Sequence, residues 1–266
     1  MLNQAKAQLL SIGGAFSSDQ VFDTYIDIFT ERARDYHLAM TTSPAARDAE
    51  FRAMVEPIAD SPEGLVCDIP SGGGYLPRYL PAGMRYVGVE PVDDFLNSGP
   101  PSYDIVKARF DDVPLPSGSV DYVISLAGLH HEECLAPVFA EMRRLLRRGG
   151  RAVIADVAVD TPPAGFLNGF VARHNPLGHD GRFLDQDTKS ALETAGIETV
   201  ADEMIEVPWT FGSFDEAATF CGNLFGIAGA GREAILGALT KEIGFAEEDG
   251  RIQLPWQLRR IVGEAV

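Results

Sequence analysis

The stretch LVCDIPSGGG, residues 65–74, decides the fold. It begins with an apolar run that contains the acid Asp68 and ends in a turn that holds Gly72 and Gly74. A short apolar run followed by glycines indicates a buried strand that ends in a tight turn. In an open α/β sheet, ligands bind at the carboxyl ends of the strands, and glycine there lets the backbone approach a ligand closely.

Further apolar runs alternate with helical patterns downstream of this stretch. The strand candidates are RYVGVE (85–90), SVDYVISLAGL (119–129) and RAVIADVAV (151–159). The apolar stripe of residues 134–150 predicts a helix that stops at Gly149-Gly150. A later helix is expected at about 188–195, then one or two strand pieces over 197–209 and a final strand or hairpin over 250–266. The alternation predicts a Rossmann-like α/β fold: a parallel sheet with an antiparallel edge strand and helices on both faces.

The segments around this core are expected to cover it. Residues 1–60 predict an N-terminal helical lid, with helix starts after Ser17-Ser18-Asp19 and at Ser43-Pro44. Residues 61–266 form the predicted ligand-binding domain, with capping insertions at about 160–182 and 212–246. The second insertion begins with a capping signal at Ser213 and holds another helix at about 232–243.

Composition narrows the class of partner. The formal net charge is −17, and affinity for nucleic acid rests on Lys and Arg that neutralise phosphates. The main basic cluster, Arg143, Arg144, Arg147 and Arg148, falls in the predicted last turn of a helix, where cations favour the helix dipole. We therefore expect no nucleic-acid partner.

The sequence also indicates a compartment. No segment approaches the ~18 uninterrupted apolar residues of a membrane span, and MLNQAKAQLLSIGG lacks the apolar centre of a secretory signal. Cys67, Cys134 and Cys221 are widely spaced and odd in number, which suits a reducing compartment. We expect a cytoplasmic protein with no membrane partner, and the sequence does not indicate its oligomeric state.

Glu90 points to a bound ribose. It ends the second strand candidate, 22 residues after Asp68, where an acid suits bonding to ribose hydroxyls. NAD-binding proteins share this feature, but three details argue against NAD. Asp68 precedes the glycines within the strand end, Pro77 interrupts the G-x-G-x-x-G pattern, and the segment ARFDDVPLPSGSVDYVIS (108–125) has no counterpart in NAD sites.

Taken in order, the D-x-x-x-G-x-G turn, Glu90, the VPLPSGSVDYVIS stretch, LHH and LLRRGGRAVIAD resemble class I S-adenosylmethionine-dependent methyltransferases. The resemblance spans roughly residues 64–158 and is strongest to the small-molecule type 11 enzymes, which include quinone and natural-product methylases. In this chain Pro70 takes the place of the usual first glycine, and Arg109 that of the usual adenine-binding acid. The resemblance implies that S-adenosyl-L-methionine is the cofactor. Asp68 and the turn through Gly72 and Gly74 would contact its methionine part, and Glu90 would hold its ribose hydroxyls. The segment Arg109-Phe110-Asp111 would line the adenine, and Leu126 would pass beneath the cofactor. Pro70 and Pro91 are further expected cofactor contacts.

His130 and His131 are the candidate catalytic bases. Histidine titrates near neutral pH and can take a proton from a hydroxyl or amine as it attacks the methyl group; a structural role is the alternative. Neighbouring side chains of an extended segment point in opposite directions, so at most one of the two is expected to face the substrate.

A metal site is not expected. His174, His179 and Asp180 lie in the first insertion and could combine with His130 and Glu132. However, the chain lacks the H-E-x-x-H spacing and has no nearby Cys pair, so exposed loop histidines are the preferred interpretation.

The sequence thus predicts methyl transfer to O, N or C of a small, partly apolar molecule. Two or three of the aromatic residues in the covering segments are expected to contact a ligand; the candidates are Phe166, Phe170, Trp209, Phe211, Phe220 and Phe225. The alternatives are an S-adenosylmethionine-binding protein with other chemistry or a scaffold role, an NAD-dependent oxidoreductase, and a non-catalytic regulatory protein.

Overall fold

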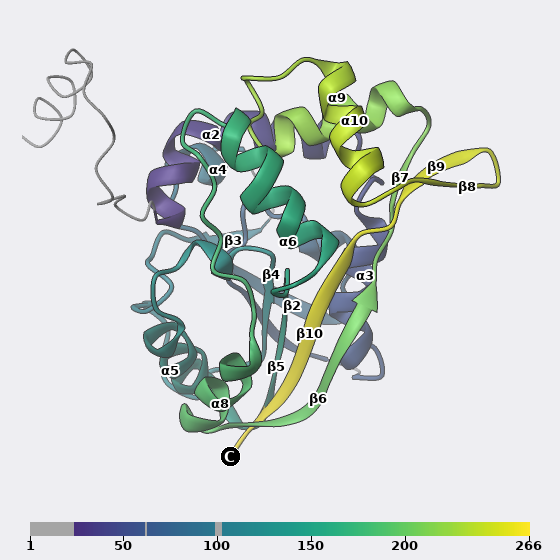
Figure 1. Cartoon of the computed structure of the whole chain (residues 1–266). Coiled ribbons are helices and arrows are strands. Elements are labelled where there is room, and N and C mark those ends of the chain that lie inside the picture. The colour runs from purple at the N-terminus through teal and green to yellow at the C-terminus, as the bar shows by residue number, and fades with distance from the viewer. Residues whose placement is uncertain (1–23, 62, 99–102) are drawn as a thin grey trace, which may run out of the picture.

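A mostly parallel sheet forms the centre of the protein, seen in a computed structural model that describes residues 24–61, 63–98 and 103–266 (Figure 1). Within these residues the sheet has seven strands in the order β3-β2-β1-β4-β5-β10-β6. The strands are β1 (Gly64–Asp68), β2 (Met84–Val89), β3 (Asp104–Val106), β4 (Val120–Leu126), β5 (Leu146–Asp156), β6 (Ile197–Glu206) and β10 (Gln257–Ala265). β1 to β5 run parallel, while β10 is antiparallel to β5 and to the edge strand β6. The predicted Rossmann-like sheet is confirmed.

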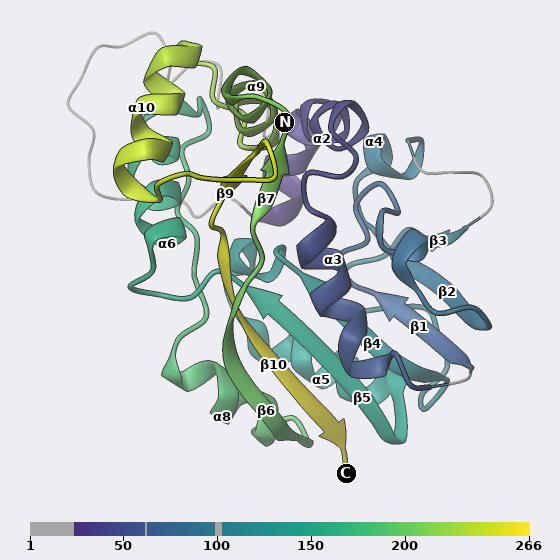
Figure 2. The same ribbon diagram turned by 90° about the vertical axis from the view of Figure 1, so that its right-hand side faces the viewer.

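Helices cover both faces of this sheet because the side chains of each strand alternate between them. Val66 of β1 packs in one apolar cluster with Phe51 and Met54 of α3 (Asp48–Val55). The next residue, Cys67, belongs to a second cluster with Phe139 of α5 (Leu135–Leu145), and α8 (Gln186–Thr194) packs beside α5. Figure 2 shows α3 in front of the sheet and α5 behind it.

The remaining helices gather at the carboxyl ends of the parallel strands, at the top of Figures 1 and 2. They are α2 (Tyr25–Thr42), α4 (Asp93–Leu96), α6 (Pro162–Phe166), a π-helical turn (Leu167–Val171), α7 (Ala172–His174), α9 (Phe214–Leu224) and α10 (Arg232–Glu242). A small antiparallel sheet of β7 (Trp209–Phe211), β9 (Arg251–Leu254) and β8 (Ala246–Glu248) lies beside them. Single 3₁₀ turns occupy Glu56–Ile58, Leu76–Tyr79 and Leu129–His131.

Two predicted helix boundaries are wrong. The helix expected at Ser43-Pro44 begins at Asp48, because the preceding residues form a hydrogen-bonded turn in which Ala46 N–H donates to Ser43 O over 3.0 Å. The helix expected to stop at Gly149-Gly150 ends at Leu145, and β5 begins at once. The two glycines therefore lie within a strand. The start at Ser17-Ser18-Asp19 falls outside the described residues; the N-cap of α2 is Thr24.

The basic cluster is consequently divided between two elements. Arg144 lies in the last turn of α5 and pairs with Glu141, whereas Arg147 lies in β5 and pairs with Asp121 at 2.6 Å. These arginines are thus held by neighbouring acids rather than presented as one basic face.

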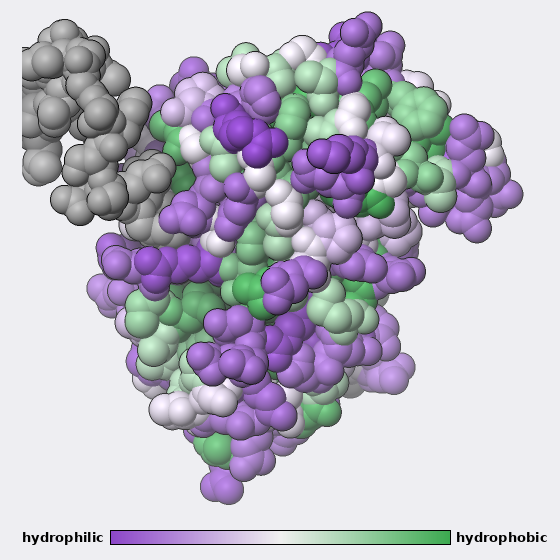
Figure 3. Space-filling model, in the orientation of Figure 1, coloured by the Kyte–Doolittle hydropathy of each residue, from purple (hydrophilic) through white to green (hydrophobic). Residues whose placement is uncertain are grey.

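The outer surface is largely hydrophilic on the face in Figure 3, where apolar side chains occur in small groups between polar ones. Across the described residues, no helix is long and apolar enough to cross a membrane.

Candidate active site

Glu90 is the anchor of the site at the carboxyl edge of β2. Its side chain is fully buried. The Oε2 atom accepts hydrogen bonds from Gly72 N–H and from the Tyr25 hydroxyl, both at 2.9 Å, and Oε1 accepts one from Val92 N–H at 2.9 Å. Burial raises the pKa of Glu90 to about 7, although these three hydrogen bonds act in the opposite direction. The acid predicted to hold ribose thus faces the glycine turn.

The turn after β1 brings polar groups to the same edge. Gly72 and Gly74 have φ angles of +52° and +72°, a conformation that side chains rarely adopt. Asp68 accepts a hydrogen bond from the Tyr86 hydroxyl at 3.0 Å, and burial raises its pKa to about 8. Ser71 Oγ is buried and has no hydrogen-bond partner among the described residues. The turn therefore presents polar groups, Asp68 and Ser71, to which a ligand could form hydrogen bonds.

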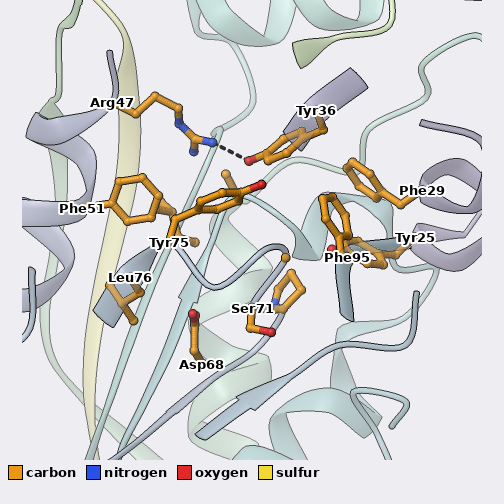
Figure 4. Close-up of a pocket in the computed structure, with 14 residues that line it drawn as sticks. Tyr25, Phe29, Tyr36, Arg47, Phe51, Asp68, Ser71, Tyr75, Leu76 and Phe95 are labelled. Atoms are coloured by element: carbon orange, nitrogen blue, oxygen red, sulfur yellow. Dashed lines mark hydrogen bonds between the residues drawn. The ribbon is translucent and has the colours of Figure 1, made fainter. Parts of the chain in front are cut away.

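A cavity of about 40 Å³ lies over this turn, between the sheet edge and helix α2. Its wall includes Asp68, Ser71 and Gly72 on the sheet side and Tyr25 and Tyr36 on the helix side. Figure 4 shows Asp68 and Ser71 on one side of the Tyr75 ring and Tyr36, bonded to Arg47, on the other. The space holds only a few water molecules, because α2 packs down on the turn.

The other predicted cofactor contacts are distributed unevenly. Pro70 and Leu126 line the cavity, and the Pro70 ring packs against Gly128, where a Cβ would clash with it. Phe110 is buried and lies edge-to-face against Tyr25, with ring centroids 4.9 Å apart. Gly74, Glu90 and Pro91 do not line this cavity; Glu90 is linked to it through its hydrogen bonds with Gly72 and Tyr25.

Arg109 and Asp111 bond to each other at the surface. Arg109 donates two hydrogen bonds to the Asp111 carboxylate, at 2.9 and 3.0 Å. The hydrogen bonds from Arg109 lower the pKa of Asp111. Asp111 is therefore an ionised acid beside the expected adenine position, and its role in binding adenine stays a prediction.

A second cavity of about 50 Å³ adjoins the first. Phe29, Tyr36 and Arg47 line both cavities. The second is largely apolar, and of the six aromatics that the sequence proposes for ligand contact, Trp209 and Phe225 reach it. This is the expected chemistry of a pocket for a partly apolar acceptor.

Three histidines line the second cavity, and two expectations about their local structure are wrong. His130 and His131 both line it, because Leu129–His131 is a 3₁₀ turn and not an extended segment. His179 lines it too and is not an exposed loop residue; its ring centroid lies 5.5 Å from that of His130. His174 stays outside this group and packs on Phe170. Burial, followed by the nearby His130 and His179, lowers the pKa of His131, so its ring is neutral.

Asp156 is a site residue that sequence reasoning missed. It ends β5, is fully buried, and bonds His130 Nδ1 at 2.7 Å and His130 N–H at 3.1 Å. The available signal was an acid that interrupts an apolar strand at the ligand edge, the pattern of Asp68 and Glu90.

Arg47 and Glu50 are also part of the site. They form a buried ion pair on the segment that leads into and through α3, and Arg47 donates to the Tyr36 hydroxyl at 2.5 Å. Burial raises the pKa of Glu50, with Arg47 acting in the opposite direction. Charged residues three apart are common on exposed helices, so no sequence signal marked this pair as buried.

Comparison with known proteins supports the resemblance. The family described as a methyltransferase domain matches residues 67–154. An uncharacterized chloroplastic methyltransferase of Arabidopsis thaliana is 30% identical over 118 residues, which are 39% of this chain and 34% of that protein. The tRNA U34 carboxymethyltransferase of Marinobacter nauticus is 29% identical over 117 residues, which are 40% of this chain and 35% of that protein. The chain thus spans about a third of the length of these curated relatives.

The fold comparison extends to almost the whole chain. The phosphoethanolamine N-methyltransferase 2 of Haemonchus contortus, solved with phosphomonomethylethanolamine and S-adenosylhomocysteine, superposes with a TM-score of 0.60 at 13% identity. The match covers 94% of this chain and 61% of that one. Residues 67–154, which match the family, include the glycine turn, Glu90 and the turn with His130 and His131. Residues 67–154 are thus similar to a methyltransferase domain, and the chain shares its fold with a solved methyltransferase.

Proposed function

We propose that the protein transfers the methyl group of S-adenosylmethionine to O, N or C of a small, partly apolar acceptor. The observation that carries this proposal is the pair of adjoining cavities with a shared wall. One cavity lies over the glycine turn, and the other is lined mainly by apolar side chains together with three histidines, Arg32 and the Arg47–Glu50 pair. Such an arrangement suits two ligands that must meet, one polar nucleoside and one apolar acceptor.

The residues in the wall of the first cavity and directly behind it fit S-adenosylmethionine. Ser71 Oγ is an unpartnered buried polar atom, and the Glu90 carboxylate is positioned by two backbone N–H groups. The Tyr25 hydroxyl bonds Glu90 Oε2 and so stands where a ribose hydroxyl would bond. Cofactor binding therefore requires Tyr25 to leave Glu90, and we assign α2 the role of a lid that opens for it.

Replacement of Tyr25 by phenylalanine tests this competition. A hydrogen bond to a charged group contributes about 1.5–3 kcal/mol, and each 1.4 kcal/mol is tenfold in affinity. Because Tyr25→Phe removes the bond that the ribose must replace, we expect it to tighten S-adenosylmethionine binding about tenfold by calorimetric titration. Tyr122→Phe is the matched control, since its hydroxyl bonds Ser61 and the residue lines neither cavity. Unchanged or weaker binding by Tyr25→Phe would contradict the competition.

The protein has little covalent chemistry to perform in this reaction. The bound sulfonium supplies an already activated methyl group, so the chain's task is to align the acceptor and exclude water. Trp209, Phe225 and the lid residue Phe29 would enclose the acceptor. His130, held by Asp156, and His131 are the candidate bases for an acceptor that must lose a proton.

Titration with S-adenosylmethionine and, separately, with NAD tests the cofactor class. Micromolar binding of the former alone supports the proposal, and S-adenosylhomocysteine formed during turnover excludes a scaffold role. Binding of NAD alone, or of neither ligand, would refute it. An RNA acceptor is included in the screen because one relative modifies tRNA; the net charge of −17 favours small molecules.

A further inference from the structure

The histidines of the second cavity have the geometry of a metal site. His130, His131 and His179 each offer a ring nitrogen, and these three atoms lie within 4.8 Å of one another. Zinc bonds imidazole nitrogen at about 2.0–2.1 Å, which places tetrahedral ligands about 3.3 Å apart. Small side-chain movements would therefore bring the three nitrogens around one ion.

Hydrogen bonds fix the ring orientation of His130. Its Nδ1 lies 2.7 Å from the buried Asp156 carboxylate, which is an acceptor, so Nδ1 carries the proton and donates it. The Nε2 atom is then left bare. Metal-binding histidines almost always donate their other N–H to a carboxylate or carbonyl in this way, which orients the ring and makes the ligating nitrogen more basic.

His179 is oriented in the same manner by a different partner. Its Nδ1 lies 2.8 Å from Asn168 Oδ1. That amide is itself fixed at both ends, because Gly181 N–H donates to Oδ1 at 2.9 Å and Asn168 Nδ2 donates to Gly181 O at 3.0 Å. His179 must therefore donate through Nδ1, which leaves Nε2 bare as well. His130 and His179 are 49 residues apart in the sequence, yet each has its Nδ1 held by a hydrogen-bond acceptor behind the ring.

From this geometry we infer that His130, His131 and His179 bind one divalent transition-metal ion, with a fourth coordination position open to the acceptor cavity. Imidazole ligands suit Zn²⁺, Fe²⁺, Ni²⁺ and Cu²⁺. Three protein ligands and an open position are the arrangement of catalytic zinc sites. The cavity beyond the open position is lined by Trp209, Trp256 and Phe225, so a ligand entering it has apolar surroundings.

The charges that face the site set the character of the fourth ligand. Asp156 favours a cation, whereas Arg32 of the lid lines the same cavity and opposes one. An anionic fourth ligand would balance the ion and Arg32 together. If the proposed methyl transfer holds, the acceptor would bind the ion through an oxygen whose proton has passed to solvent. A bound ion would also occupy His130 Nε2, so the metal and the histidine base are alternative means of activating the acceptor.

The test is metal titration of the full chain, without an affinity tag that holds histidines and after treatment with a chelator. We expect one equivalent of Zn²⁺ to bind with micromolar or tighter affinity by calorimetry. Co²⁺ should give the visible absorption of a tetrahedral complex. His179→Ala should weaken Zn²⁺ binding at least ~100-fold and Asn168→Ala, which removes only the outer partner, by about 10–100-fold. His174→Ala is the matched control and should bind as the unaltered protein does, because His174 packs outside the cluster.

The outcomes separate this inference from the proposed function. Absence of Zn²⁺ binding by the unaltered chain, or equal binding by His179→Ala and His174→Ala, overturns the metal site. A titration with S-adenosylmethionine on the same samples reports on the cofactor alone. Cofactor binding without metal binding overturns only the metal site, and metal binding without cofactor binding overturns only the methyl transfer. Thermal unfolding checks that each variant is folded, and Asn168→Ala still tests the site if His179→Ala is not.

Discussion

The substitution Glu90→Gln is expected to weaken S-adenosylmethionine binding by at least ~100-fold in calorimetric titration. A ribose diol would bond this carboxylate through two hydrogen bonds to a charged group, each contributing about 1.5–3 kcal/mol. Glutamine would also disturb the backbone around position 90. Both carboxylate oxygens of Glu90 accept a hydrogen bond from a backbone N–H, and glutamine has only one acceptor oxygen. Its amide NH₂ would then face Val92 N–H or Gly72 N–H and displace the turn.

Asp93→Asn is the matched control for this prediction. Asp93 lies three residues further along the chain and forms an exposed ion pair with Lys107. Its substitution removes the same charge without touching the cavity, so the affinity for S-adenosylmethionine should stay within about twofold, as exposed pairs contribute little. Equal losses in the two variants would mean that only the general negative charge matters and that Glu90 is not the ribose ligand.

A second large effect is expected at the glycine turn, where Gly72→Val should abolish detectable cofactor binding. The φ angle of +52° is a genuine outlier for a β-branched residue and costs at least about 1–2 kcal/mol. The backbone would relax to a negative φ and carry Gly72 N–H away from Glu90 Oε2, which it now bonds at 2.9 Å. Calorimetry with S-adenosylmethionine measures the loss.

Gly118→Val is the control that separates the effect of backbone strain on stability from the loss of the cofactor site. Gly118 has a φ of +65°, and a Cβ there would lie 3.9 Å from its nearest neighbour, Arg147 Cα. It should therefore lower the melting temperature to a degree similar to Gly72→Val and leave cofactor affinity unchanged. Retention of normal binding by Gly72→Val would refute the assignment of this turn to the cofactor.

The central sheet could be predicted because its strands carry strong local signals. The parallel strands β1 and β4 are largely buried, and their sequences are rich in apolar residues. Helix ends were less predictable. Gly149 and Gly150 resemble a helix stop, but pairing of Leu146 with Val120 draws the chain into β5 before the glycines are reached. Tertiary pairing thus overrode a local signal.

The candidate site was predictable where it is local in sequence and not where distant segments meet. Asp68, Gly72 and Glu90 lie at strand ends, which the alternation pattern locates. The histidine cluster depends on a 3₁₀ turn at His131 and on a loop that returns His179 to the same place. Neither event leaves a periodic pattern, and so His179 was expected at the surface.

Helix α2, the proposed lid, forms part of both cavities, and this has a kinetic consequence. Its residues Phe29 and Tyr36 line each cavity, and Arg32 ties it to α9 by a hydrogen bond of 2.7 Å from Nη2 to Leu224 O. If α2 moves away so that S-adenosylhomocysteine can be exchanged for S-adenosylmethionine, the acceptor cavity is opened to solvent as well. An acceptor that needs several methyl groups would then be released between rounds, so partly methylated intermediates would accumulate in solution and the order of ligand release would not be random.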